Sequence, residues 1–178
     1  MEEMRFIRPT KEYLQQVWEY KQEMLAADSS MDGAGPLRRV NSAEEWLELV
    51  RGYEAMQEAT EKLVPATQFI LVRKSDNRLV GMLQVRHCFN DYLEKYAGHI
   101  GYSVRPSERR KGYAKAMLQE ALVFCREKLS LEQVLITCYP HNEGSRRTIL
   151  SCGGVYDYTI HEPGENVDLE RYWVPTTK

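Results

Sequence analysis

The sequence is short of cysteine, has no excess of basic residues and contains no long apolar run. The four cysteines, Cys88, Cys125, Cys138 and Cys152, form no Cys-x-x-Cys pair, which argues against a disulfide framework or a metal site and favours reduced thiols in a cytoplasm. Lysine and arginine number 24 against 26 acidic residues, so a dedicated nucleic-acid binder is not expected. No segment approaches the ~20 apolar residues of a membrane span, and the start lacks the pattern of a signal peptide.

The composition that remains is that of a globular protein. The 178 residues are 43% hydrophobic and 28% charged, with a formal net charge of −2. A chain of this length buries roughly two thirds of the surface that its unfolded form exposes, so it needs no metal or disulfide for stability. We expect one domain over residues 1–178, with no membrane or nucleic-acid partner.

Hydrophobic periodicity predicts an α/β chain. Strands are expected at residues 5–8, 67–73, 79–89, 99–104, 134–138, 155–160 and 168–174. Helices are expected at residues 11–27, 42–56 and 114–129, and from Asn142 to the pair Gly153-Gly154. Thr10 and Asn142 are expected N-caps, and Ser42 with Glu45 forms a capping box. The order of elements predicts a mostly antiparallel central sheet with flanking helices and a parallel crossover near its centre.

Residues 28–40 form a long loop between the first two predicted helices. The loop carries Gly33, Gly35 and Pro36, and loops of this length in compact domains are usually functional or mobile. We therefore expect it to take part in substrate binding. The acidic residues Glu162 and Glu165, near the end of the chain, are expected to be plain surface residues.

The stretch from Val104 to Lys115 carries the strongest chemical signal. It leaves a strand, turns and enters a helix, with five basic residues against one acidic residue, a net charge of +4. A helix N-terminus has free N–H groups and about half a positive charge, so basic side chains there are unfavourable unless an anion binds. Gly112 and Ala114 allow a ligand to approach the backbone closely. The segment therefore predicts an anion cradle suited to a pyrophosphate.

Simpler explanations of these residues stay open at this point. The glycine patterns of nucleotide P-loops and of dinucleotide-binding folds are both missing from the sequence. A solvated charge run would explain Arg109, Arg110 and Lys111 without any ligand. Simple helix capping would explain Asn142.

The pattern Arg109-x-x-Gly112-x-Ala114, preceded by Val104-x-Pro106, resembles the acetyl-CoA motif of the GNAT family of N-acetyltransferases. Asn142-x-x-Ser145 resembles the family's pantetheine-side asparagine and its hydroxyl partner. The order of elements resembles the family over residues 5–174, which implies a GNAT-like fold. The cofactor-binding residues that the resemblance implies are Tyr102, Val104, Arg109, Arg110, Lys111, Gly112, Tyr113, Ala114, Lys115, Asn142 and Ser145.

The resemblance implies an N-acetyltransferase that uses acetyl-CoA as cosubstrate and acetylates a primary amine of a small molecule or a protein. Transfer would be direct, in a ternary complex, with a backbone N–H near Tyr102 donating to the thioester carbonyl. A CoA-binding sensor or a catalytically inactive module is the alternative, and a module that binds nucleic acid through the basic turn is another. A homodimer is the oligomer to test.

The catalytic residues are harder to predict than the cradle. An amine with a pKa of about 10.4 must lose a proton before it attacks, so a base or ordered water is needed. His99 and Tyr139 are the expected catalytic residues, although His99 points away from the face of Tyr102 unless a β-bulge turns it. Many GNAT members carry a tyrosine that protonates the departing thiolate at the position of Ile149.

Overall fold

Two antiparallel sheets make up the framework of the chain in the computed structural model, which describes residues 2–177. The first sheet has the strand order β1-β2-β3-β4 and the second has the order β5-β7-β6. The strands are β1 (Met4–Ile7), β2 (Ala66–Arg73), β3 (Arg78–Arg86), β4 (Ile100–Val104), β5 (Gln133–Cys138), β6 (Val155–Glu162) and β7 (Val167–Pro175). The α-helices are α1 (Leu14–Ala26), α2 (Ala43–Ala55), α3 (Tyr113–Leu129) and α4 (Glu143–Ser151).

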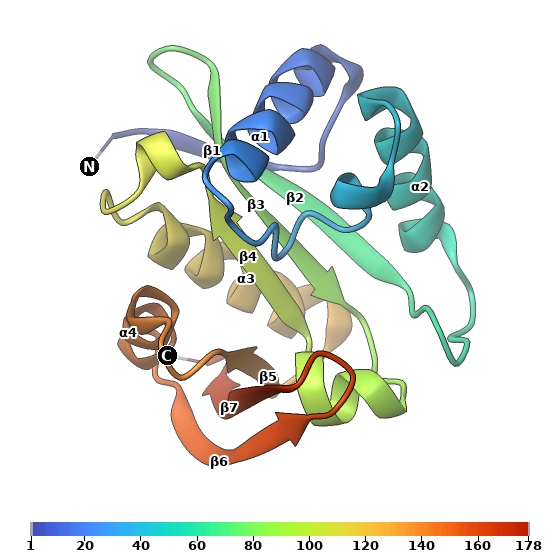
Figure 1. The fold of residues 1–178 in the computed structure, drawn as a ribbon, viewed down its shortest axis with the longest axis vertical. Coiled ribbons are helices and arrows are strands. Elements are labelled where there is room, and N and C mark those ends of the chain that lie inside the picture. The colour runs from blue at the N-terminus through green and yellow to red at the C-terminus, as the bar shows by residue number, and fades with distance from the viewer. Residues whose placement is uncertain (1, 178) are drawn as a thin grey trace.

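Helices cover both faces of the first sheet, with α1 and α2 on one face and α3 on the other (Figure 1). The alternation of side chains along β2 explains this arrangement. Phe69 and Leu71 belong to the buried cluster that contains the apolar stripe of α3, whereas Ile70 and Val72 belong to the cluster that contains α1 and α2. Because apolar side chains point to both faces, β2 is buried along nearly its whole length.

The predicted fold class, an α/β fold with mostly antiparallel strands and flanking helices, is confirmed. The predicted parallel crossover within one sheet is not formed among residues 2–177. The connection through α3 leads from β4 in the first sheet to β5 in the second, and every ladder between named strands is antiparallel. Just before β4, the backbone pairs with β5 through an isolated bridge between Gly98 and Ile136. Beside it the Leu135 N–H donates to the His99 ring at 2.9 Å instead of to a backbone carbonyl, so the ladder does not continue.

The helix caps follow the predictions with one exception. The Ser42 hydroxyl accepts from the Glu45 N–H at 3.1 Å, and the Asn142 side chain accepts from the Ser145 N–H at 3.1 Å. Gly153 takes the left-handed conformation expected after a helix, with φ of 88°. Thr10 makes no side-chain cap, because the 3₁₀ turn η1 (Lys11–Tyr13) precedes α1.

The loop of residues 28–40 is held against the first sheet. The Gln68 side chain donates to the Gly33 carbonyl at 2.6 Å, and the Trp46 indole donates to the Ala34 carbonyl at 2.7 Å. A Cβ on Gly33 would lie 2.2 Å from the Gly101 carbonyl oxygen, so the backbone of the loop is in direct contact with β4. Gly33 has φ of 75°, which also favours glycine.

Candidate functional site

A cavity of about 820 Å³ lies where the two sheets separate. Strand β4 forms one wall and the end of β5 forms another. The first turns of α3 and α4, the 28–40 loop and the turn between β6 and β7 complete it. Segments from most of the chain therefore meet at one site.

The open edge of β4 faces this cavity. Hydrogen bonds from the Arg105 N–H to the Val80 carbonyl and from the Arg86 N–H to the His99 carbonyl show that the odd-numbered residues of this segment pair with β3. Backbone groups alternate between the two edges of a strand, so Tyr102 and Val104 present their N–H and C=O groups to the other edge. Both residues line the cavity.

The turn before α3 has the backbone of an anion cradle. Arg110 and Gly112 are both left-handed, with φ of 64° and 83°. A Cβ on Gly112 would meet no protein atom within 4 Å, so it would point into open space beside the cavity that Gly112 lines. The first N–H groups of α3 have no intrahelical partner. A diphosphate therefore fits both the shape and the donors of this turn.

Three basic side chains at the cradle remain available to an anion. Arg109, Arg110 and Lys115 line the cavity, and within residues 2–177 none of them forms a salt bridge with a carboxylate. Arg109 donates to the Val104 carbonyl at 3.0 Å and to the Ser29 hydroxyl at 2.7 Å, so its guanidinium is fixed in place. These unpaired cations at a helix N-terminus favour the anion site over a plain charged surface.

Two residues predicted at the cradle turn their side chains elsewhere. Lys111 does not line the cavity, because its Nζ lies 2.7 Å from Glu108 Oε2. Tyr113 lines the cavity, but its ring is buried and its hydroxyl donates to Glu2 at 3.0 Å. Contacts from these two residues to a ligand would therefore come from the backbone.

The start of α4 forms the opposite rim. Asn142 and Ser145 both line the cavity, and the Tyr102 hydroxyl lies 2.9 Å from Ser145 Oγ. Burial raises the pKa of Tyr102 above its ordinary range, so the phenol stays protonated. The Asn142 side-chain oxygen caps α4. Because Asn142 also lines the cavity, it can cap the helix and contact a ligand at the same time.

His99 lies apart from the cavity, whereas a catalytic base is expected to line it. The side chain is buried against Phe89, with ring centroids 4.1 Å apart, and His99 is not among the cavity-lining residues. Its Nδ1 accepts from the Leu135 N–H. Burial, with a smaller contribution from Arg86, lowers the pKa of His99 to about 4. No register shift occurs between β3 and β4, so no bulge turns the ring toward the cavity.

Tyr139 is the predicted catalytic residue that does line the cavity. Its ring stacks on His141 with centroids 5.4 Å apart. Burial raises the pKa of Tyr139, and Asp32 and Glu165 contribute to the rise. The phenol is therefore protonated near neutral pH. Ile149, which stands at the position of the family tyrosine, is fully buried in the core and carries no polar group to the site.

The family model of the acetyltransferase (GNAT) domain matches residues 4–155. The chain belongs to this family. Its enzyme class is therefore the one expected from the sequence, an N-acetyltransferase. No curated protein matches this GNAT chain in sequence.

Solved structures of other GNAT proteins share the fold. A ribosomal-protein-S5-alanine acetyltransferase from Vibrio fischeri has a TM-score of 0.74 at 17% identity, covering 100% of this chain and 96% of that chain. A dodecameric spermidine N-acetyltransferase from Vibrio cholerae has a TM-score of 0.66 at 13% identity, with coverage of 98% and 95%. A ribosomal L7/L12 α-N-protein acetyltransferase in complex with coenzyme A has a TM-score of 0.72 at 14% identity, with coverage of 98% and 96%.

The acidic residues Glu162 and Glu165, which are expected at the surface from the sequence, line the far end of this GNAT cavity. Glu162 is only 6% exposed, and Glu165 and Asp32 also line the cavity, beside Tyr92 and Tyr96. The carboxylate of Glu162 accepts from the Gly164 N–H at 3.1 Å and from the Glu165 N–H at 2.5 Å. The expectation for Glu162 was therefore wrong. The nearby Pro163-Gly164 turn was a usable signal, since a carboxylate before a turn can fold back onto its N–H groups.

No group of three or more His, Cys, Asp and Glu side chains in residues 2–177 is arranged to hold a metal ion. Among the described helices, none is both long and apolar enough to cross a membrane.

Proposed function

We propose that this GNAT protein transfers the acetyl group of acetyl-CoA to a primary amine that carries positive charge when free in solution. The observation that carries the proposal is the polarity of the cavity. Its cradle end is lined by Arg109, Arg110 and Lys115. Its far end is lined by the carboxylates of Asp32, Glu162 and Glu165, which outnumber the guanidinium of Arg86 beside them. An anionic cosubstrate and a cationic acceptor would therefore approach one site from opposite ends.

The cradle end fits the diphosphate of CoA. Open space beside Gly112, the left-handed turn and the first N–H groups of α3 provide room and donors for phosphate oxygens. The open edge of β4 leads from this end into the cavity. The backbone of Tyr102 and Val104 supports the proposed binding of the pantetheine arm along that edge, where an N–H would donate to the thioester carbonyl as it gains negative charge.

The far end fits an ammonium group. Asp32, Glu162 and Glu165 come from the 28–40 loop and the β6–β7 turn, and Tyr92 and Tyr96 stand beside them. In residues 2–177 no salt bridge joins any of the three carboxylates to a basic side chain. Glu162 is buried with backbone N–H groups as partners, so its charge remains available to attract a cation.

The proposed reaction asks little of titrating side chains. An ammonium ion loses its proton to water or to a cavity carboxylate, and the free amine then attacks the thioester carbonyl. The carbon–sulfur bond breaks as the amide forms, and the nitrogen gives up its second proton to water. The sulfur leaves as a thiolate whose conjugate thiol has a pKa of roughly 8.5, so it departs readily. Tyr139 lines the cavity and its raised pKa keeps it protonated, which supports a role in which it returns a proton to the sulfur.

An acceptor panel tests this proposal directly. Acetyl-CoA is incubated with the protein and with polyamines, amino acids, amino sugars, peptides with free N-termini or, as a control, neutral alcohols, and release of free CoA thiol is measured. We expect thiol release with acceptors that are cationic and little with neutral alcohols. Binding of CoA without thiol release across the panel would instead indicate a CoA-binding module without turnover.

A matched pair of variants tests the polarity of the cavity. Asp32→Asn removes one cavity carboxylate without changing its size, whereas Asp157→Asn removes a carboxylate that does not line the cavity. We expect the first variant to raise KM for the best cationic acceptor by about tenfold, and the second to leave it unchanged within about twofold. An unchanged KM in both variants would contradict electrostatic recognition of the acceptor.

A further inference from the structure

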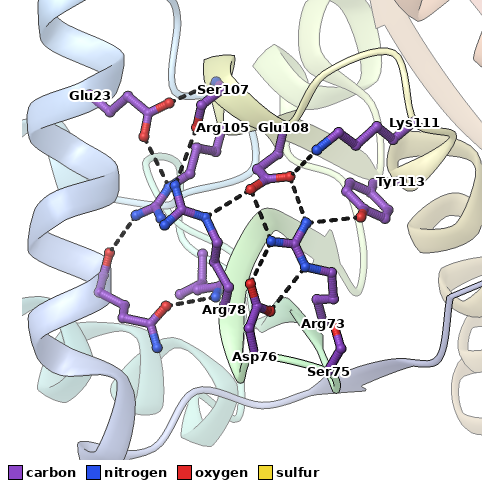
Figure 2. Close-up of polar contacts among 12 residues, drawn as sticks. Glu23, Arg73, Ser75, Asp76, Arg78, Arg105, Ser107, Glu108, Lys111 and Tyr113 are labelled. Carbon is purple, nitrogen blue, oxygen red and sulfur yellow. Dashed lines mark hydrogen bonds and ion pairs between the residues drawn. The ribbon is translucent and has the colours of Figure 1, made fainter.

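A network of ion pairs beneath the cradle binds the loop of residues 105–112, which joins β4 to α3, to the β2–β3 hairpin (Figure 2). Its centre is Glu108, at the end of the 3₁₀ turn η4 (Pro106–Glu108), whose side chain is 7% exposed. The Glu108 carboxylate accepts from Arg73 at 2.7 and 3.2 Å and from Lys111 at 2.7 Å. Arg78 Nε lies 2.8 Å from the same carboxylate.

The partners of Glu108 come from two places. Arg73 ends β2 and Arg78 begins β3, so both belong to the rigid hairpin at the centre of the first sheet. Lys111 belongs to the loop itself. The Glu108 carboxylate thus fixes the loop to the sheet through Arg73 and Arg78, and it also pairs with Lys111 of the loop.

The network divides the basic residues of the loop and of the first turn of α3 into two sets. Arg105 pairs with Glu23 at 3.2 Å and Lys111 pairs with Glu108, so both are neutralised by the protein. Arg109, Arg110 and Lys115 keep their charges for the cavity. The positive charge that faces the cavity is therefore set by which carboxylates the loop meets, and not by the number of basic residues in the motif.

The conformation of the cradle needs such support. Arg110 is left-handed, which is unfavourable for a residue other than glycine and persists only where the surroundings hold it. The turn from Arg109 to Gly112 runs between Glu108, which is fixed to the hairpin, and the first residues of α3. Release of Glu108 would free one end of this turn, and its N–H groups would lose their common direction.

We propose that Glu108 is a positioning residue for the CoA diphosphate, which acts through Arg73 and Arg78 by holding the cradle turn in its binding conformation. The inference rests on the proposed function, because it assumes that the cradle binds CoA. An acidic side chain that lines the cavity so close to a diphosphate would otherwise repel it. Its three cationic partners remove that repulsion, which explains why an acid is tolerated within this basic loop.

The test compares two variants that each remove one carboxylate from Arg73. Glu108→Gln releases the loop from the hairpin. Asp76→Asn is the matched control, because Asp76 binds the same guanidinium at 2.6 and 2.9 Å but does not line the cavity or belong to the loop. The Kd for CoA is measured by calorimetric titration of each folded variant, and the Tm is measured without ligand.

We expect Glu108→Gln to raise the Kd for CoA by about tenfold or more, and Asp76→Asn to change it by less than about twofold. A purely structural role would lower the Tm of both variants and leave the Kd of both unchanged. An unchanged Kd in Glu108→Gln, or an equal rise in both variants, would overturn the inference.

Arg78→Gln provides the measurement if Glu108→Gln does not fold. Arg78 is 36% exposed, so its replacement is tolerated more easily, and it removes one of the two hairpin partners of Glu108. We expect a rise in the Kd for CoA of about three- to fivefold, and an unchanged Kd would overturn the inference. Failure of the wild-type protein to bind CoA would instead contradict the proposed function itself.

Discussion

The hydroxyl of Tyr102 lies 2.9 Å from Ser145 Oγ, so strand β4 and the first turn of α4 are joined side chain to side chain at the cavity wall. The same serine donates its backbone N–H to the Asn142 side chain. One short chain of hydrogen bonds therefore runs from the first sheet to the cap of α4. It connects the two halves of the site that a pantetheine arm would lie between.

Gly112→Asp tests the cradle. The new side chain would project into the open space where a diphosphate is expected and would carry the same sign of charge. We expect the Kd for CoA to rise by at least tenfold, which corresponds to about 1.4 kcal/mol. Gly52→Asp is the control, since Gly52 lies in α2 with no atom within 4 Å of its Cβ position and outside the cavity. Equal affinity in the two variants would contradict the cradle.

Asn142→Ala combined with Ser145→Ala tests the opposite rim. Loss of the cap should lower the free energy of unfolding by about 1 kcal/mol. We also expect a rise in the Kd for CoA that is smaller than that of Gly112→Asp, because these residues would hold the pantetheine arm and not the diphosphate. Thermal unfolding and calorimetric titration measure the two effects. Lower stability with unchanged binding would leave Asn142 with capping alone.

His99→Asn separates a structural role from a catalytic one. The Asn amide oxygen can accept from the Leu135 N–H where Nδ1 now does, so we expect near wild-type turnover and an unchanged pH profile between pH 6 and 8. His99→Ala leaves that N–H without an acceptor and should cost about 1–3 kcal/mol of stability. A loss of kcat of about a hundredfold in His99→Asn, the scale of a positioned base, would restore His99 as the catalytic base.

Tyr139→Phe tests the proposed proton donor. Removal of the hydroxyl leaves the ring stacked on His141, so we expect binding of CoA to stay unchanged. The fall in kcat should be about tenfold to a hundredfold with an acetyl-CoA substrate. An acyl donor whose thiol has a lower pKa should lose much less, because its thiolate needs no proton. Equal losses with both donors would argue against proton donation by Tyr139.

The stability of the protein should fall as the pH is lowered through the range in which Glu108 titrates. Hydrogen bonds from Arg73, and to a smaller extent from Lys111, hold the pKa of Glu108 at about 2, below its ordinary value of 4.5. A carboxyl with a lowered folded-state pKa contributes stability above the unfolded value and loses it as the pH falls toward the folded value.

The window for this loss is therefore about pH 5 to pH 2. The contribution of Glu108 should be roughly 1–2 kcal/mol, because solvent screens Arg78 and Lys111 on the exposed side of the network. Urea unfolding of the wild type and of Glu108→Gln across this window measures it. We expect the difference in stability between the two proteins to shrink toward pH 2, and a constant difference would contradict the assignment.

Local chemistry explains what the sequence could predict. The helix caps at Ser42 and Asn142 depend on contacts within a few residues, and the structure confirms them. The anion cradle before α3 stays a prediction, and the left-handed residues Arg110 and Gly112 give its turn the shape that it requires. These features follow from local sequence signals, which can be read from a single sequence.

Long-range partners explain what the sequence could not predict. Lys111 was expected to face a ligand, but its carboxylate partner is itself held by Arg73, 35 residues before it. His99 was expected to act as a base, but its ring accepts from Leu135, 36 residues away. Glu162 and Asp32 meet in one cavity although 130 positions separate them. Such pairings depend on how the elements pack, and no periodicity indicates them.

The contact between Gly33 and Gly101 sets limits on how acceptor preference can diverge in descendants of this chain. Any side chain at Gly33 would meet the Gly101 carbonyl and push the loop away from β4. Ser30 and Asp32, which precede this contact, line the cavity and are exposed, whereas Met31 is buried in the core and Ser29 holds Arg109. Drift in substrate range, and laboratory redesign of it, should therefore be tolerated at Ser30 and Asp32, with the glycine kept as a fixed anchor.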